Sequence, residues 1–206
     1  MLHPLWRVIK KYATYLPMRQ GSFRFEDRQL PYFCHFYNQT WMNELCVEVA
    51  LAMSFVQPGL RILEVGRVLD HYTNLPHDCV DKFEKGALNV DVVDFKPSSP
   101  YDLILSLSTL EHVGWDENRD PVKIHIAIKH LHSLLKPGGR MVATVPTGYN
   151  ENLDADLKNG VRLFDEQYYF TRKPSGRWVQ THALELLPYN FRDGWANAFI
   201  LGVSRA

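Results

Sequence analysis

The feature that most constrains the fold is an alternation of apolar, strand-like runs with a helical pattern from Leu60 to the C-terminus. The strand-like runs cover residues 60–65, 77–83, 88–95, 101–108, 140–146 and 196–205. Residues 121–135 between them carry apolar side chains at helical spacing, and Asp120 and Pro121 suit the cap and first turn of that helix. Strands that alternate with helices form a mainly parallel sheet with helices on both faces. The sequence therefore predicts an α/β fold.

The C-terminal part departs from this alternation. No helical pattern long enough for a crossover separates the aromatic run near 168–180 from the last apolar run at 196–205. Strands without a crossover pair antiparallel. We expect these two strands to form an antiparallel hairpin at the edge of the sheet.

Residues 1–58 form an N-terminal extension that is rich in aromatic residues, and residues 59–206 form the domain on which it packs. Apolar spacing predicts one helix over about 40–56, which Pro58-Gly59 ends. It predicts another at the N-terminus, where the apolar stripe comprises Leu5, Trp6, Ile9, Tyr12 and Leu16. This stripe either packs on the domain or rests on an anionic membrane surface as a basic amphipathic helix. Both interpretations remain open.

Composition excludes several classes of protein. The chain has 206 residues, and its 23 basic side chains balance its 23 acidic ones, which disfavours a general nucleic-acid binder. No apolar run approaches the ~20 residues of a membrane-spanning helix, and Arg7, Lys10 and Lys11 interrupt any signal-peptide pattern. The three cysteines and nine histidines show no metal-ligand spacing. We expect a cytoplasmic protein with reduced thiols and no metal.

Acidic residues stand at the ends of three predicted strands: Glu64, Asp81 and Asp94. In an open parallel sheet, ligands bind beyond the carboxyl ends of the strands. Carboxylates there can accept hydrogen bonds from hydroxyl and amino groups. Three such ends facing one crevice indicate a ligand site.

The chain resembles the class I S-adenosylmethionine-dependent methyltransferases. The resemblance covers roughly residues 60–146 and rests on "ILEVG", on "STLEHV" at 108–113 and on "LLKPGGRMVATVP" at 134–146. It implies a Rossmann-like fold and S-adenosylmethionine as cofactor. By this resemblance Glu64 would hold the methionine end, Asp81 the ribose hydroxyls and Asp94 the adenine amine. The pocket-lining set it implies comprises Ser106, Leu107, Ser108 and Glu111.

The first glycine motif is divergent. The family usually has Gly-x-Gly-x-Gly, whereas "EVGRVLDHY" retains Gly66 alone. A dinucleotide enzyme needs several glycines because the backbone approaches a pyrophosphate closely. S-adenosylmethionine has no phosphate, so one close approach at Gly66 can suffice. We expect Val68 and Leu69 to pack beneath a working loop.

The expected function is methyl transfer to a small molecule, such as a hydroxyl of a sugar or related metabolite. The candidate general bases are His71, His112 and Asp154. His112 can equally be structural. The candidate substrate-binding residues are Trp115, Tyr149 and Asn150, and Arg172, Lys173 and Arg177 either bind an anionic group or form a solvated face. The alternative function is a non-catalytic relative that serves as a binding or partner subunit.

Overall fold

The computed structural model describes the backbone of residues 4–206 and the side chains from residue 12 onward. The N-terminal part contains α1 (Pro4–Arg19), the hairpin of β1 (Ser22–Phe25) and β2 (Arg28–Pro31), the short irregular helix η1 (Tyr37–Met42) and α2 (Leu45–Met53). The predicted helix over 40–56 is therefore shorter than expected. The irregular helix η1 ends at Met42, and α2 begins only at Leu45, whose amide donates to the Asn43 side chain at 3.1 Å.

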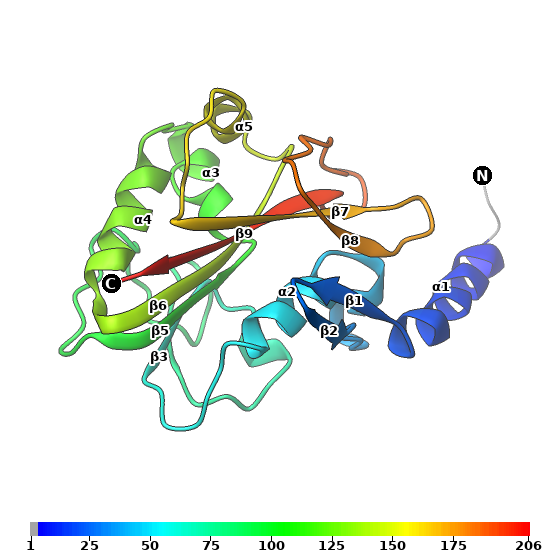
Figure 1. Ribbon diagram of the computed structural model, residues 1–206, viewed down its shortest axis with the longest axis horizontal. Helices are drawn as coiled ribbons and strands as arrows, with labels where there is room; N and C mark the ends of the chain where they lie inside the picture. The colour runs from blue at the N-terminus through cyan, green and yellow to red at the C-terminus, as the bar shows by residue number, and fades with distance from the viewer. Residues whose placement is uncertain (1–3) are drawn as a thin grey trace.

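A seven-stranded sheet forms the centre of the molecule (Figure 1). Its strands are β3 (Ile62–Val65), β4 (Asp78–Val80), β5 (Tyr101–Leu107), β6 (Leu135–Pro146), β7 (Glu166–Arg172), β8 (Trp178–Thr181) and β9 (Ala198–Arg205). Their spatial order is β4-β3-β5-β6-β9-β7-β8. β4, β3, β5 and β6 are parallel, whereas β9 is antiparallel to both of its neighbours. The expected α/β fold class is confirmed: a Rossmann-like, mainly parallel sheet flanked by helices, with antiparallel C-terminal strands.

The C-terminal strands differ in one detail from the expected edge hairpin. Residues 168–180 span two strands, β7 and β8, which pair antiparallel at the edge. β9 then inserts between β6 and β7, because residues 182–197 are long enough to return the chain across β7 and β8. The predicted antiparallel pairing with the last strand is confirmed, but that strand lies inside the sheet.

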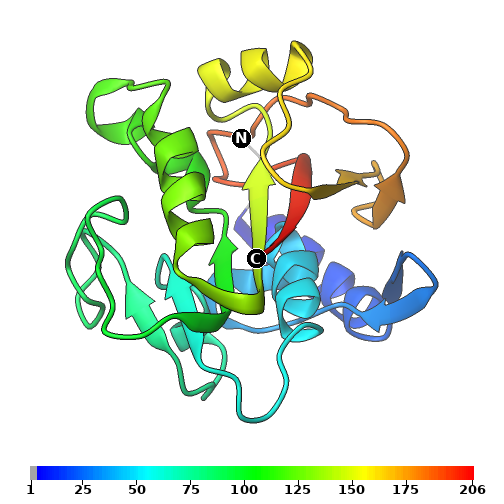
Figure 2. The same ribbon diagram turned by 60° about the vertical axis from the view of Figure 1, so that its left-hand side comes forward.

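Helices cover both faces of the sheet. α4 (Lys123–Ser133) and α5 (Glu151–Lys158) pack on one face, and α2 packs on the other (Figures 1 and 2). α4 buries Ile124, Ala127 and Leu131 as the sequence predicts. The Asp120 carboxylate accepts hydrogen bonds from the Val122 and Lys123 amides at 2.9 and 3.3 Å. The Lys-Pro-Gly-Gly turn differs from expectation because it belongs to the first part of β6.

The predicted strand over 88–95 is wrong. This stretch forms turns, with a single bridge between Val80 and Leu88. The cause lies at Asp91, whose carboxylate and carbonyl accept hydrogen bonds from the Val93 and Asp94 amides. A side chain that bonds its own following backbone competes with strand pairing.

The N-terminal helix packs through a different face from the expected one. Tyr12 and Leu16 are exposed, whereas Tyr15 and Met18 pack against the core. Leu5, Trp6 and Ile9 lie outside the described side chains. Within the described part of the chain, none of the helices combines the length and the hydropathy needed to cross a bilayer.

Candidate active site

A cavity of about 340 Å³ lies beyond the carboxyl ends of β3, β4 and β5. It is lined by residues 65–68 after β3, residues 80–84 after β4, residues 90–92, and side chains of the segment 109–117 after β5. This is the edge at which open parallel sheets bind ligands. Of the residues that the sequence analysis proposed for cofactor binding, substrate binding or catalysis, Gly66, Asp81 and His112 line this cavity.

Gly66 turns the chain sharply where β3 ends. Its φ is +83°, a left-handed conformation that residues with a Cβ rarely adopt. A Cβ at this position would lie 2.1 Å from the Thr109 Oγ1. The next residues behave as predicted, since Leu69 is fully buried beneath the loop and Val68 packs against the core.

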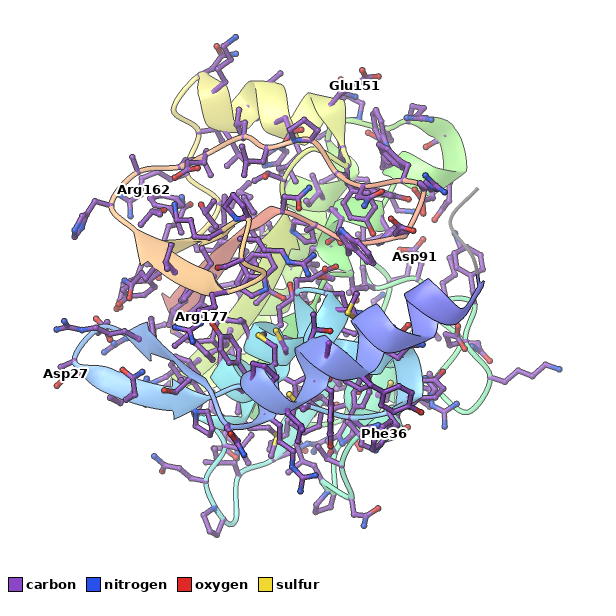
Figure 3. All side chains as sticks on the ribbon, turned by 90° about the vertical axis from the view of Figure 1, so that its right-hand side faces the viewer. Asp27, Phe36, Asp91, Glu151, Arg162 and Arg177 are labelled. Atoms are coloured by element: carbon purple, nitrogen blue, oxygen red, sulfur yellow. The ribbon has the colours of Figure 1, made fainter. Side chains whose placement is uncertain are left out.

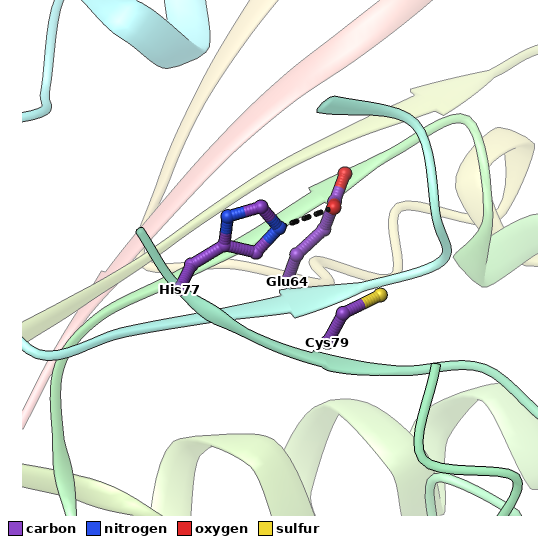
Figure 4. Close-up of side chains that lie close together, drawn as sticks. All are labelled: Glu64, His77 and Cys79. Carbon is purple, nitrogen blue, oxygen red and sulfur yellow. Dashed lines mark hydrogen bonds and ion pairs between the residues drawn. The ribbon is translucent and has the colours of Figure 1, made fainter. Parts of the chain in front are cut away.

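Glu64 holds this loop from beneath. Its fully buried carboxylate accepts hydrogen bonds from the Val68 and Leu69 amides at 2.9 and 2.6 Å. The second oxygen, Oε2, lies 2.9 Å from Nε2 of His77 (Figure 4). The Glu64 hydrogen bond raises the pKa of His77. The carboxylate that the resemblance assigned to the methionine end is therefore engaged by the protein itself.

Glu64, His77 and Cys79 also form a cluster that sequence reasoning missed. One donor atom from each lies within 4.8 Å of the others, as in a metal site (Figure 4). Burial raises the pKa of the Cys79 thiol to about 12, and a metal-ligating cysteine must be deprotonated. His77 Nδ1 lies 2.6 Å from the Leu75 carbonyl, to which it can only donate. An ionic His77–Glu64 pair explains this geometry without a metal.

Asp81 stands directly after β4 at the wall of the cavity. Its Oδ1 accepts hydrogen bonds from the Phe83 and Glu84 amides at 2.8 and 2.9 Å. Within the described residues, Oδ2 has no hydrogen-bond partner in the structure. Two loop amides thus orient the carboxylate and leave one oxygen for a ligand.

In the segment 88–95, the acidic residue that lines the cavity is Asp91. Asp94, which the resemblance assigned to the adenine amine, is exposed and does not line it. Asp91 Oδ2 lies 2.6 Å from the Lys123 Nζ and 3.1 Å from the Lys82 Nζ. The sequence signal was ambiguous because "DVVD" offers two carboxylates three residues apart, and only the turn geometry separates them.

His112, Asp116 and Tyr149 form a connected group at the rim of the cavity. Nδ1 of His112 lies 2.7 Å from Asp116 Oδ2, and the Tyr149 hydroxyl donates to Asp116 Oδ1 at 2.8 Å. The His112 and Tyr149 rings are 4.5 Å apart between centroids. Burial and the hydrogen bond to Asp116 raise the pKa of Tyr149. Asp116, which is not among the candidates from the sequence, joins the two candidate residues.

The other two candidate bases lie away from the cavity. His71 is exposed and stacks on Tyr37, with 4.8 Å between ring centroids. Asp154, on α5, accepts the single N–H of Gly148 with both carboxylate oxygens, at 3.1 and 2.9 Å. Its carboxylate fixes the turn that follows β6.

Three of the four predicted pocket residues at the end of β5, Ser106, Leu107 and Ser108, are engaged within the protein, whereas Glu111 is engaged only in part. Ser106 and Leu107 are fully buried, and Ser106 donates to the Val65 carbonyl at 3.2 Å. Ser108 donates to the carboxylate of Glu48 at 2.7 and 2.9 Å. Glu111 is buried, and its Oε2 has no hydrogen-bond partner in the described part of the chain.

Two of the predicted substrate residues are also buried. Trp115 is covered by the guanidinium of Arg119, whose central carbon lies 4.0 Å from its ring centroid. Asn150 caps α5 by accepting from the Leu153 amide at 3.0 Å, and it donates to the Glu111 carbonyl at 3.0 Å. Of the three, Tyr149 is the one that belongs to the His112 group.

Glu44 and Glu48 were missed from the sequence, although both lie within an otherwise apolar helical stretch. Burial raises the pKa of Glu44 to about 7 and that of Glu48 to about 8. Glu44 accepts a hydrogen bond from the Ala196 amide at 3.0 Å. Burial likewise raises the pKa of Glu111 well above its ordinary value. Glu44 and Glu48 could have been noticed in the sequence, because each is an acidic residue within an apolar helical stretch.

No family model matches the chain, and no curated protein matches it. Among solved structures, the N-methyltransferase NodS from Bradyrhizobium japonicum WM9 with bound S-adenosylhomocysteine is 13% identical. The match covers 76% of this chain and 82% of NodS with a TM-score of 0.48. An S-adenosylmethionine-dependent methyltransferase from Thermotoga maritima is 14% identical, and the match covers 100% of this chain and 99% of that protein with a TM-score of 0.48.

A third similar structure is the 1,6-didemethyltoxoflavin-N1-methyltransferase from Burkholderia thailandensis. It is 11% identical, and the match covers 90% of this chain and 98% of that enzyme with a TM-score of 0.43. At such identities and scores, the activity of this chain has to be argued from its own residues.

Proposed function

We propose that the chain is an S-adenosylmethionine-dependent methyltransferase that acts on a hydroxyl group of a small molecule. The observation that carries the proposal is the cavity in which Gly66 and Asp81 meet at the carboxyl ends of two adjacent parallel strands. Parallel sheets bind nucleoside-containing ligands at this place.

The residues of the cavity fit this cofactor in their chemistry. Asp81 Oδ2 can accept a hydrogen bond from a ribose hydroxyl. Phe83 and Val90 line the cavity and leave 73% and 40% of their surface exposed, which is unusual for large apolar side chains. An adenine ring would cover them. When bound, the cofactor supplies an electrophilic methyl group on sulfur.

We propose His112 as the general base. A neutral imidazole that donates from Nδ1 to Asp116 keeps Nε2 as an acceptor. Nε2 would take the proton of the substrate hydroxyl, and Asp116 would stabilise the imidazolium that then forms. Tyr149 holds Asp116 from the other side and so orients the base indirectly.

Calorimetric titration with S-adenosylhomocysteine tests the proposal. We expect micromolar binding by the unchanged chain and a loss of about 1–3 kcal/mol for Asp81→Asn, because a ribose hydroxyl would lose a charged acceptor. Asp94→Asn is the matched control: it removes an exposed carboxylate outside the cavity and should bind as the unchanged chain does. Equal affinity for Asp81→Asn would contradict the assignment.

The second candidate function is a non-catalytic relative. It is favoured by one observation: Asp91 is paired with Lys82 and Lys123, and Glu64 with His77, so two carboxylates of this region are engaged by the protein's own side chains. The same titration separates the two functions. Absence of binding at millimolar S-adenosylhomocysteine would support the relative and rule out the enzyme.

A further inference from the structure

A second and larger cavity, of about 700 Å³, lies at another part of the same sheet edge. It is bounded by α1, by η1, by the turn between β7 and β8, and by the segment 187–197. Figure 1 shows α1 and the β7–β8 hairpin on the same side of the molecule. β7 runs parallel to β6, since both are antiparallel to β9, so this cavity also lies at the carboxyl ends of parallel strands.

The charge of this cavity is one-sided. Among the described residues, its lining contains Arg172, Lys173 and Arg177 and no acidic residue. Its other walls include the apolar side chains of Trp41, Leu187 and Trp195. Figure 3 labels Arg177 and Asp91, which line the two cavities, on different sides of the view. The second cavity thus differs in chemistry from the first, whose lining includes Asp81, Asp116 and Glu117.

Arg172 is the half-buried cation of this group. Its main chain is fixed by a 2.8 Å hydrogen bond from its amide to the Asn197 carbonyl, and its guanidinium lies over the Trp195 ring at 5.3 Å from the centroid. Within the described residues, no carboxylate lies within 4.0 Å of the guanidinium. Burial lowers the pKa of Arg172, although a guanidinium stays charged.

Two acidic groups act on Arg172 from a greater distance: the Cys46 thiol, whose pKa burial raises well above its ordinary value, and Glu44. The Glu44 carboxylate is occupied by the Ala196 amide, and burial raises its pKa to about 7, so it balances the charge of Arg172 only in part. A partly buried cation without an ion pair is costly unless an anion completes it. The planar fork of a guanidinium, stacked on an aromatic ring, is suited to bidentate binding of an oxyanion.

We propose that this cavity binds a small molecule that has a carboxylate or phosphate group on an apolar body. Arg172 takes the oxyanion, Lys173 and Arg177 add long-range attraction, and Trp41 and Trp195 contact the apolar part. The proposal concerns this cavity alone and does not depend on the cofactor site.

Calorimetry on the full chain tests it with three probes of similar shape: phenyl phosphate, phenylacetate and neutral phenylacetamide. We expect one or both anions to bind and the amide to bind at least about tenfold more weakly, the usual value of a charge-assisted pair. Binding of one anion alone identifies the oxyanion as phosphate or carboxylate. Binding of neither anion, or equal binding of the amide, would overturn the proposal.

Variants locate the site. Arg172→Gln should lose about tenfold or more in anion affinity, and Arg172→Lys should lose part of it because the charge remains but the fork does not. Arg205→Gln removes an exposed arginine at the far end of β9 and should change nothing. Unchanged anion binding by a folded Arg172→Gln would sink the assignment. S-adenosylhomocysteine titration of Arg172→Gln should match the unchanged chain, so failure here and failure of the proposed function give different results.

Discussion

At Gly66 the need for glycine arises within the fold as well as at the cavity. The backbone is left-handed there, and a Cβ would lie 2.1 Å from the Oγ1 and 2.7 Å from the Cγ2 of Thr109. Thr109 is itself fixed, because its hydroxyl donates to the Leu107 carbonyl at 2.9 Å. The expectation that glycine at this position serves cofactor approach therefore covers only part of its role.

We accordingly expect Gly66→Ala to lower the free energy of unfolding by about 2–4 kcal/mol, the sum of a left-handed penalty and an overpacked contact. Gly66→Ala with Thr109→Ala should recover part of this loss, since the two shortest contacts disappear while the backbone strain remains. Urea unfolding of the three variants, with Thr109→Ala as reference, measures both effects. A double variant no more stable than Gly66→Ala alone would show that Thr109 is not the obstacle.

Residue roles were harder to predict than residue positions. Glu64 and Asp81 do lie at the ends of strands, but this position does not determine which groups their carboxylates bind. His77 lies thirteen residues from Glu64 in the sequence, and no local pattern connects them. Asp116 could not be assigned a role from the sequence, because its link to His112 and Tyr149 depends on the fold.

Among the elements, α5 depends most clearly on one residue. Asn150 accepts from the Leu153 amide, which begins the helix, and donates to the carbonyl of buried Glu111. We expect Asn150→Ala to cost about 2 kcal/mol, since it removes the cap and leaves a buried carbonyl unpaired. Asn150→Ser keeps a capping acceptor without introducing a charge beside the Glu111 carbonyl, so it should cost clearly less. Thermal unfolding of both variants checks this, and equal losses would mean that the cap contributes nothing.

The elements that periodicity predicted well are long and have one or two buried faces. β5, β6, β9 and α4 are of this kind. β1, β2 and β8 have four residues each, too few to show a period. They pair in local hairpins, β1 with β2 and β8 with β7, and contacts with distant parts of the chain then hold the N-terminal hairpin in place. The Tyr32 hydroxyl, for example, bonds the backbone of Trp178 across 146 residues. Such long-range pairing leaves no local signal.

At the scale of the whole molecule, buried acids lie where the N-terminal segment meets the sheet. Glu44 precedes the first residue of α2, and Glu48 lies within that helix. Glu44 accepts a hydrogen bond from the Ala196 amide before β9, and Glu48 accepts one from the Ser108 hydroxyl after β5. The raised pKa values of both arise from burial. Between their unfolded and folded pKa values, these groups are protonated in the folded chain and ionised in the unfolded chain. The free energy that holds the N-terminal segment on the sheet therefore depends on pH.

The sign of that dependence follows from linkage. A carboxyl whose pKa rises from 4.5 when unfolded to about 7 or about 8 when folded stabilises the protein below pH 4.5. This contribution falls as the pH rises through that window and is lost above it. His77 acts in the same direction, because its raised pKa makes its ion pair with Glu64 strongest below 6.5 and lost as the pH passes its folded pKa.

We therefore expect the melting temperature to fall steadily from about pH 5 to about pH 9, and Glu48→Gln to flatten that fall. The amide resembles the protonated carboxyl, so the variant should match the unchanged chain near pH 5 and be the more stable of the two near pH 9. His77→Gln keeps a donor for Glu64 without titrating, and it should remove the smaller contribution that begins near 6.5. Thermal melts across this range measure both. A melting temperature that rises with pH in the unchanged chain, with Glu48→Gln following the same curve, would show that Glu48 ionises freely in the folded protein.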